Sequence, residues 1–169
     1  MRLFIGLPFS HQSRRDFLQI QKRLQRNAGK GNFTAVENFH LTLAFLGEVE
    51  PERLPRIFSA LEEAKVPPLE LVFDRLGSFD GGIWYLSPAS CPALTDGQRR
   101  LAEALRKRGF SLAEQPYIPH LTLGRKILLR EGYVPRKVLR HPISARSEGA
   151  RLFHSHRVEG HLRYDILSP

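Results

Sequence analysis

The spacing of hydrophobic residues along the chain changes between the two-residue period of strands and the longer period of helices. The two-residue period predicts strands at residues 2–8, 39–46, 69–73, 83–86, 118–123, 150–158 and 161–167. The helical period predicts helices that begin after Ser10, at Pro51 and at Pro92, since serine caps a helix and proline fits its first turn. Gly109 is typical of the end of the third helix. The expected buried faces are Phe17, Ile20 and Leu24, then Leu54, Ile57, Phe58 and Leu61, then Leu94, Leu101 and Leu105.

The segments between these elements have the composition of turns and loops. Residues 80–82, Asp-Gly-Gly, predict a hairpin turn, and Gly47 is expected to end the strand before it. Residues 27–32 are predicted to be a loop, 33–36 a short strand, and 125–142 a basic connection broken by prolines. Strands and helices alternate without a long linker, which predicts an α+β or α/β domain with mostly antiparallel sheets.

Length, charge and cysteine content narrow the class of protein. The 169 residues suffice for one domain, or for two small lobes with a common core. Lysine and arginine number 26 against 17 acidic residues, a net charge of +9 that favours RNA, DNA or an anionic membrane face as partner. The alternative explanation is that the protein comes from an organism whose proteins are generally rich in arginine, which would give the same excess of basic residues. A lone cysteine, Cys91, and the lack of a long apolar run or signal-peptide core favour a reducing cytoplasm.

One tetrapeptide, His-Leu-Thr-Leu, occurs at residues 40–43 and again at residues 120–123, once in each half of the chain. In a strand its leucines point to the core, while His40 and Thr42, like His120 and Thr122, point the other way. A single copy is usually an ordinary half-exposed strand. Two copies on a basic chain favour a catalytic site in which the two halves face each other.

Two imidazoles and two hydroxyls suit chemistry at a phosphodiester. A neutral imidazole can accept a proton from water while an imidazolium protonates the departing ribose oxygen, and threonine hydroxyls can donate to the phosphate oxygens. A zinc site is the weaker interpretation, because neither motif has a cysteine or aspartate beside it on the same strand face.

These motifs resemble those of the two-histidine (2H) phosphoesterases, and most closely those of the RNA 2′,3′-cyclic phosphodiesterases, formerly called 2′-5′ RNA ligases. Residues 37–49 resemble the first motif block of that family and residues 119–125 the second, and residues 2–8 and 163–167 also fit. The resemblance implies a bilobal, pseudo-symmetric α+β fold of residues 1–169, one domain of two intertwined lobes. Its mostly antiparallel sheets would line a central groove with the helices outside.

The resemblance also implies a reaction, the hydrolysis of a 2′,3′-cyclic phosphate RNA end, or of a 2′,3′-cyclic nucleotide, to a 2′-phosphate without metal or cofactor. His120 would be the general base and His40 the general acid, although a near-symmetric site can work in either direction. Thr42 and Thr122 would bind the phosphate. Arg125 and Phe45, five residues after each histidine, match family site positions. Strict alternation puts both on the face opposite the histidines, so the strands must bend or end near residues 44 and 124.

Other residues leave alternatives open. Tyr117 is a candidate for the groove lining, whereas Trp84 and Tyr85 are better explained as core. The late histidines are expected at solvated strand positions rather than in a metal site: His154, His156 and His161. Two basic clusters are either solvated or an RNA track: Arg99, Arg100, Arg106, Lys107 and Arg108, and Arg136, Lys137, Arg140 and Arg146.

Three functions remain to be separated. They are cyclic phosphate hydrolysis, reversible 2′-5′ RNA joining, and RNA binding without catalysis. We expect the protein to act as a monomer, with no membrane partner.

Overall fold

The computed structural model describes residues 1–133, 135 and 138–169, so the predicted basic residues Arg136 and Lys137 lie outside the described residues. Its helices are α1 (His11–Arg26), α2 (Leu54–Ala64) and α3 (Pro92–Lys107), with 3₁₀ turns η1 (Val36–Asn38) and η2 (Pro51–Arg53). Its strands are β1 (Arg2–Pro8), β2 (Ala28–Phe33), β3 (His40–Glu48), β4 (Glu70–Phe79), β5 (Ile83–Pro88), β6 (Leu121–Leu129), β7 (Ile143–Arg146), β8 (Arg151–Val158) and β9 (His161–Leu167).

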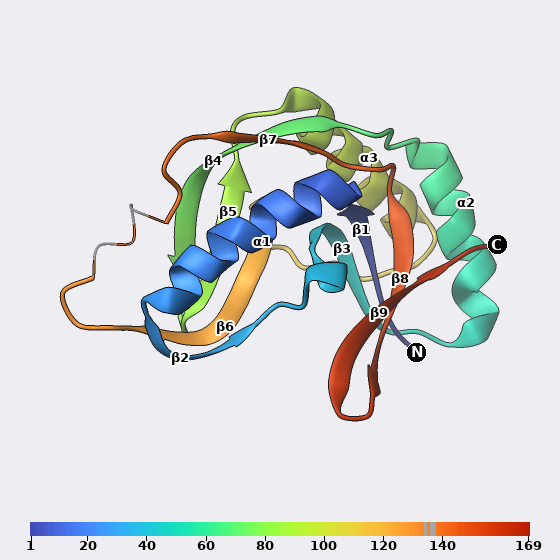
Figure 1. Cartoon of the computed structure of the whole chain (residues 1–169). Coiled ribbons are helices and arrows are strands. Elements are labelled where there is room, and N and C mark those ends of the chain that lie inside the picture. The colour runs from blue at the N-terminus through green and yellow to red at the C-terminus, as the bar shows by residue number, and fades with distance from the viewer. Residues whose placement is uncertain (134, 136–137) are drawn as a thin grey trace.

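The strands form two sheets in which every pair is antiparallel, as Figure 1 shows. One sheet has the order β3-β1-β8-β9 and the other the order β2-β6-β5-β4-β7. The helix α1 packs beside β2 and β7, whereas α3 packs against β3 and α2 against α3. Each sheet thus has helices of its own, and the predicted α+β class with antiparallel sheets is confirmed.

The predicted start of the first helix and the predicted end of the third helix are confirmed. The Ser10 hydroxyl accepts a hydrogen bond from the Ser13 amide (3.2 Å), which caps α1 as predicted. Gly109 follows α3 with φ of 80°, a left-handed conformation that suits glycine at a helix end. The second helix begins later than predicted, because Pro51 opens the 3₁₀ turn η2 and the α-helix starts at Leu54. In the described residues, no helix is long and apolar enough to cross a membrane.

Four predictions for strands and loops were wrong. Residues 27–32 belong mostly to β2, which pairs with β6, and the strand predicted at 33–36 ends at Phe33. Gly47 lies inside β3 with φ of 70° rather than ending it. The strand of the second motif begins at Leu121 and continues to Leu129, and β7 was not predicted within or after the basic connection. Where a strand was missed, in β2 and β7, a partner strand supplies hydrogen bonds that overcome weak local strand propensity.

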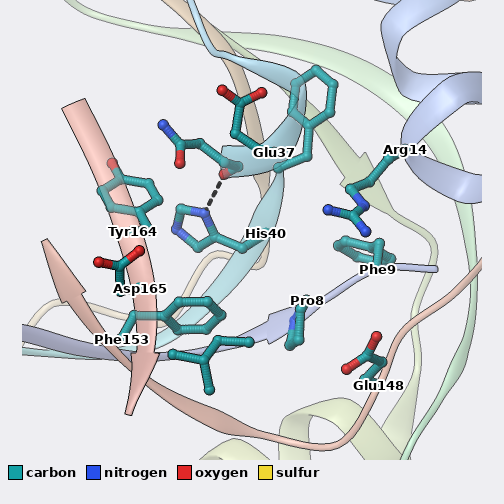
Figure 2. Close-up of a pocket in the computed structure, with 12 residues that line it drawn as sticks. Pro8, Phe9, Arg14, Glu37, His40, Glu148, Phe153, Tyr164 and Asp165 are labelled. Carbon is teal, nitrogen blue, oxygen red and sulfur yellow. Dashed lines mark hydrogen bonds between the residues drawn. The ribbon is translucent and has the colours of Figure 1, made fainter. Parts of the chain in front are cut away.

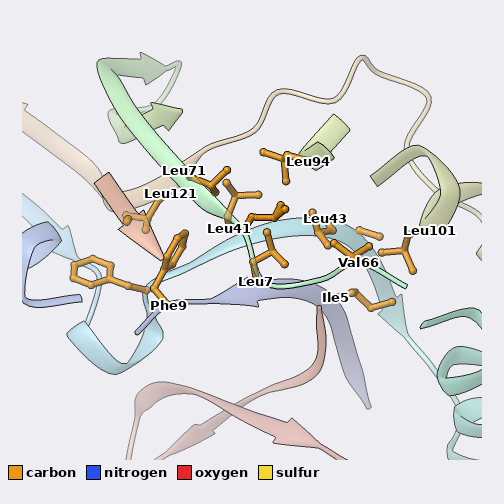
Figure 3. Close-up of a cluster of buried hydrophobic side chains, with 14 of the residues drawn as sticks. Ile5, Leu7, Phe9, Leu41, Leu43, Val66, Leu71, Leu94, Leu101 and Leu121 are labelled. Carbon is orange, nitrogen blue, oxygen red and sulfur yellow. The ribbon is translucent and has the colours of Figure 1, made fainter. Parts of the chain in front are cut away.

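The hydrophobic core is continuous between the two sheets. Figure 3 shows Leu41 and Leu43 of the first motif packed near Leu71 and Leu121 of the other sheet, with Leu101 of α3 beyond them. These side chains are almost fully buried. The leucines of both tetrapeptides therefore anchor their strands in one core, and the polar residues between them are held on the opposite faces.

Candidate active site

The first motif contains a β-bulge. Gly6 of β1 pairs with Thr42 and Ile5 pairs with Ala44, so Leu43 has no partner residue. An extra residue of this kind reverses the alternation of side chains beyond it. Phe45 therefore returns to the face that carries His40, where its ring is 60% exposed and lies 5.8 Å from the ring of Phe4.

The second motif also contains a β-bulge, at the equivalent residue of its tetrapeptide. Tyr85 of β5 pairs with Thr122 and Trp84 pairs with Gly124, which leaves Leu123 without a partner residue. Arg125 is exposed, and its charge acts on both His40 and His120, whose pKa values it lowers. The bend that the sequence analysis required near residues 44 and 124 is thus confirmed as a pair of bulges.

Each bulge is held by a glutamine from a helix. The carbonyl oxygen of Leu43 accepts a hydrogen bond from Nε2 of Gln98 in α3 (3.2 Å). The carbonyl oxygen of Leu123 accepts a hydrogen bond from Nε2 of Gln21 in α1 (2.8 Å). The same nitrogen also donates to the backbone carbonyl oxygen of Thr34 (2.7 Å). The sequence analysis missed both glutamines. Their positions on the buried stripes of their helices, next to leucines and isoleucine, are the signal that could have found them.

The two histidines have equivalent hydrogen bonds. Nδ1 of His40 lies 2.7 Å from the carbonyl oxygen of Asn38, and Nδ1 of His120 lies 2.7 Å from that of Ile118. A carbonyl can only accept, so Nδ1 carries the proton in both rings and Nε2 of each neutral ring is a proton acceptor. The Thr42 hydroxyl, 3.0 Å from Nε2 of His40, donates to it.

Aromatic rings surround both imidazoles. His40 lies 4.7 Å from Phe4, 5.1 Å from Tyr164 and 5.9 Å from Phe153, measured between ring centroids. His120 lies 5.1 Å from Phe79 and 5.3 Å from Tyr85. The sequence analysis expected Trp84 and Tyr85 in the core, which is confirmed for Trp84. Tyr85 instead belongs to the surroundings of the site.

Burial and positive charge keep both histidines neutral. Loss of solvation lowers the pKa of His40 to about 4, the Asn38 carbonyl raises it, and the charges of His120 and Arg125 lower it further. The pKa of His120 is lowered by burial and by Arg125, against its own carbonyl hydrogen bond. Because His120 and Arg125 both act on His40, the two motifs lie close together, and β3 contacts β6.

Tyr117 connects the second motif to the first. Its hydroxyl donates a hydrogen bond to the backbone carbonyl of Thr42 (3.1 Å), and burial raises its pKa. Tyr117 therefore holds the strand that carries His40. Thr122 is half-buried in β6 beside His120.

A pocket of about 300 Å³ adjoins His40 on the side of Asn38. Figure 2 shows His40 with Glu37, Glu148 and Arg14 around it, together with the rings of Phe153 and Tyr164. The lining of the pocket combines apolar rings with side chains of both charges.

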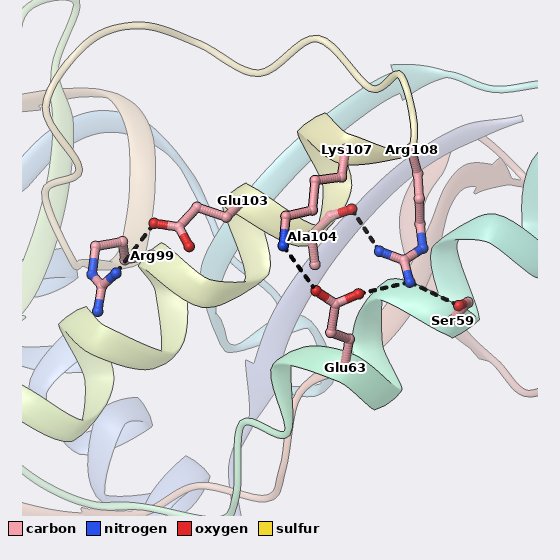
Figure 4. Close-up of polar contacts among 7 residues, drawn as sticks. All are labelled: Ser59, Glu63, Arg99, Glu103, Ala104, Lys107 and Arg108. Atoms are coloured by element: carbon pink, nitrogen blue, oxygen red, sulfur yellow. Dashed lines mark hydrogen bonds and ion pairs between the residues drawn. The ribbon is translucent and has the colours of Figure 1, made fainter.

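The late histidines and the helical cations have protein partners. His154 and His156 stack at 4.8 Å, and Nε2 of His156 lies 2.7 Å from Asp165. In the described ranges, no three or more histidine, cysteine, aspartate or glutamate side chains are grouped to hold a metal ion. In α3, Lys107 and Arg108 pair with Glu63 of α2 (3.4 Å and 2.8 Å; Figure 4), so part of this basic cluster joins two helices.

The duplicated histidine strands in two antiparallel sheets define the class of the two-histidine phosphoesterases. The family model of the LigT-like phosphoesterases matches residues 7–85. A relative from Archaeoglobus fulgidus, named RNA 2′,3′-cyclic phosphodiesterase, is 33% identical over 74% of this chain and 72% of its own length. One with the same name from Geobacillus stearothermophilus is 29% identical over 73% of this chain, which spans only 41% of that relative.

The solved structures agree with the sequence comparisons. The crystal structure of E. coli LigT in complex with 3′-AMP superimposes on this structure with a TM-score of 0.82 and a sequence identity of 25%. The comparison covers 99% of this chain and 95% of the LigT chain. A Thermus thermophilus protein has the same fold, with a TM-score of 0.73 and 24% identity over 99% of this chain and 96% of that one. The chain belongs to the LigT-like phosphoesterase family, which includes these RNA 2′,3′-cyclic phosphodiesterases.

Proposed function

We propose that this protein hydrolyses RNA 2′,3′-cyclic phosphate ends, and 2′,3′-cyclic nucleotides, to 2′-phosphates by metal-independent acid–base catalysis. The observation that carries the proposal is the pair of equivalent imidazoles, His40 and His120, each with Nδ1 tied to a carbonyl and Nε2 available for proton transfer. The names of the relatives support the choice of substrate.

The reaction needs two proton transfers. Nε2 of His120 accepts a proton from water as the water oxygen attacks phosphorus, and the bond from phosphorus to O3′ breaks. Nε2 of His40 gives its proton to O3′, which leaves a free 3′-hydroxyl and a 2′-phosphate. Each transfer contributes a factor of about 10²–10⁴ to the rate. The hydroxyls of Thr42 and Thr122 and the guanidinium of Arg125 donate to the phosphate oxygens as their charge increases.

The acid role of His40 requires a proton that the unliganded protein does not hold at neutral pH, because its pKa is about 4. The phosphodiester carries a negative charge, which raises the pKa of a nearby imidazole. Substrate binding therefore raises the pKa of His40 and favours its protonated form. The opposite assignment, with His40 as the base, would leave His40 neutral but would need the same change at His120, whose pKa is also lowered.

Phe45 and Tyr117 complete the proposed site. The exposed ring of Phe45 offers a stacking face for a base or ribose. Tyr117 keeps the His40 strand in place through Thr42. For the setting of the reaction, we propose a monomer in the cytoplasm, where a chain with one cysteine needs no disulfide.

The test is hydrolysis in EDTA of an oligoribonucleotide that ends in a 2′,3′-cyclic phosphate, followed by phosphorus NMR. We expect a 2′-monophosphate, and a loss of at least about 100-fold in kcat for both His40→Ala and His120→Ala. His11→Ala, at an exposed position of α1, is the matched control and should retain wild-type turnover. A cyclic phosphate that persists with the wild-type protein would refute the proposal.

The same samples separate the alternatives. An added RNA with a free 5′-hydroxyl would yield a 2′-5′ linkage if the protein joins RNA. An RNA-binding module without catalysis would give no product, and its affinity would not respond to the histidine substitutions.

A further inference from the structure

The face of the four-stranded sheet that carries His40 continues past the histidine to the start of β1. Phe4 forms its centre, with its ring 4.7 Å from His40 and 4.9 Å from Tyr164. Side chains of a strand alternate between faces, so Arg2 projects from the same face as Phe4, about 7 Å along β1. Arg2 is exposed and belongs to neither tetrapeptide.

The guanidinium of Arg2 forms no ion pair with the residues that the structure describes. In the part of the chain that the structure describes, no carboxylate forms an ion pair with Arg2 or with Arg125. The neighbouring Glu48 pairs instead with the amino group of Met1 (3.3 Å). Burial raises the pKa of Tyr164, while the charges of Arg125 and Arg2 lower it, so both cations lie near this ring.

Exposed apolar side chains lie on the same face. Phe45 is 60% exposed, and Leu162 of β9, two residues before Tyr164, is 45% exposed. A stacking ring with unpaired cations beside it is the arrangement that binds single-stranded nucleic acid. We call Arg2, Phe45, Leu162 and Tyr164 the strand-entry surface.

We propose that the strand-entry surface binds the nucleotide that precedes the cyclic phosphate, and that Arg2 contacts the phosphodiester joining this nucleotide to the terminal one. The inference rests on the proposed function, since it takes the cyclic phosphate to lie at His40. It goes further in its choice of substrate, because it makes the end of an RNA chain a better substrate than a cyclic mononucleotide. The net charge of +9 favours such a polyanion.

Two substrates isolate this contact. Adenosine 2′,3′-cyclic phosphate has no internal phosphodiester, whereas a diadenosine dinucleotide with the same cyclic end has one. The measured quantity is kcat/KM for the dinucleotide divided by kcat/KM for the mononucleotide. We expect Arg2→Gln to reduce this ratio about tenfold, the usual effect of losing a hydrogen bond to a charged group. Arg2→Lys, which keeps the charge but not the planar fork, should reduce it less.

A matched control removes the same charge elsewhere. Arg56 is exposed on α2 and belongs to neither of the basic clusters, and Arg56→Gln should keep the wild-type ratio. The logarithm of kcat/KM for the dinucleotide should also depend less steeply on the logarithm of salt concentration in Arg2→Gln, by about 0.7 in slope.

The outcomes distinguish the subsite from the activity. A wild-type protein that hydrolyses both substrates equally well, or an Arg2→Gln variant that keeps the wild-type ratio, would overturn the subsite and leave the proposed function intact. A ratio that falls equally in Arg56→Gln would show an effect of net charge alone and would also overturn it. If the wild-type protein hydrolyses neither substrate, the proposed function fails, and the subsite fails with it.

Discussion

At the scale of single residues, the protonation of His40 results from two opposed effects. The hydrogen bond from Nδ1 to the Asn38 carbonyl favours the imidazolium, because a charged ring donates more strongly. The rings of Phe4, Phe153 and Tyr164 keep water away and favour the neutral form. Burial has the larger effect, so the pKa is about 4 in the folded protein. An unfolded histidine has a pKa of about 6.5.

This difference makes the stability of the protein depend on pH in a predictable direction. Between pH 6.5 and pH 4 the unfolded chain binds a proton at His40 that the folded protein does not bind, so stability falls as the pH is lowered through this range. We expect wild type to lose about 2 kcal/mol more than His40→Gln between pH 7 and pH 4.5. Urea unfolding at the two pH values measures this difference.

Other titrating groups do not affect the comparison, because they are common to both proteins. Asp165 and Glu63, whose pKa values are lowered by hydrogen bonds to His156 and Arg108, destabilise wild type and variant alike as they become protonated. His11→Gln, at an exposed site, should retain the wild-type difference. An equal loss of stability in His40→Gln and wild type would contradict the protonation described here.

At the scale of elements, each active-site strand depends on a helix that is distant in sequence. A bulge leaves one residue out of the ladder, and its carbonyl needs another donor if it is buried. Gln98 supplies that donor to Leu43, and Gln21 adds a second donor to Leu123, whose carbonyl also accepts from the Thr34 amide (3.0 Å). The first helix thus supports the second motif, and the third helix supports the first motif.

The two glutamines should differ in their effect on stability. Gln21 is buried and donates to two carbonyls, whereas Gln98 donates to one and is partly buried. In Gln21→Leu the Thr34 carbonyl loses its donor, whereas the Leu123 carbonyl keeps the one from the Thr34 amide. We expect Gln21→Leu to lower the free energy of unfolding by about 2 kcal/mol and Gln98→Leu by about 1 kcal/mol, because unsatisfied carbonyls are costly when buried. Denaturant titration measures both. Gln19→Leu, on the exposed face of α1, should change stability little; a similar loss there would contradict this role for Gln21.

The bulges also explain how far the sequence alone could predict the site. The alternation of side chains along a strand correctly predicts that His40 and Thr42 share one face and that Leu41 is buried on the other. The hydrophobic pattern determines which face is buried. The same rule puts Phe45 and Arg125 on the wrong face. The bulges that bring these two residues to the histidine face are held by Gln98 and Gln21. Both glutamines come close to the strands only through tertiary packing, so a local sequence pattern cannot show the bulges.

The strand β2 was missed for a related reason. Its sequence, Ala-Gly-Lys-Gly-Asn-Phe, is typical of a loop. Gly31 lies so close to Ile127 of β6 that a side chain would stand 2.7 Å from an Ile127 carbon. The glycine therefore permits close approach to a neighbouring strand, and only the position of that strand distinguishes this use from a turn.

At the scale of the whole molecule, contacts cross between the two halves of the chain. The helix α1 from the first half packs beside β7 and donates from Gln21 to the second motif, and Tyr117 from the second half donates to Thr42. The hydrophobic core includes residues of both sheets. The spacing of the two histidines therefore depends on the two sheets remaining folded together.

We expect one cooperative unfolding transition as a consequence. Trp84, the lone tryptophan, lies in β5 and reports on the five-stranded sheet by fluorescence. Circular dichroism reports on all helices, including α2 and α3 near the four-stranded sheet. The two signals should give the same urea midpoint, and Gln21→Leu should lower both midpoints by the same amount, because one unit unfolds. Gln19→Leu is again the control. Two separated midpoints, or a shift of the fluorescence transition alone, would show that the sheets unfold independently and that the histidines are not held by a common core.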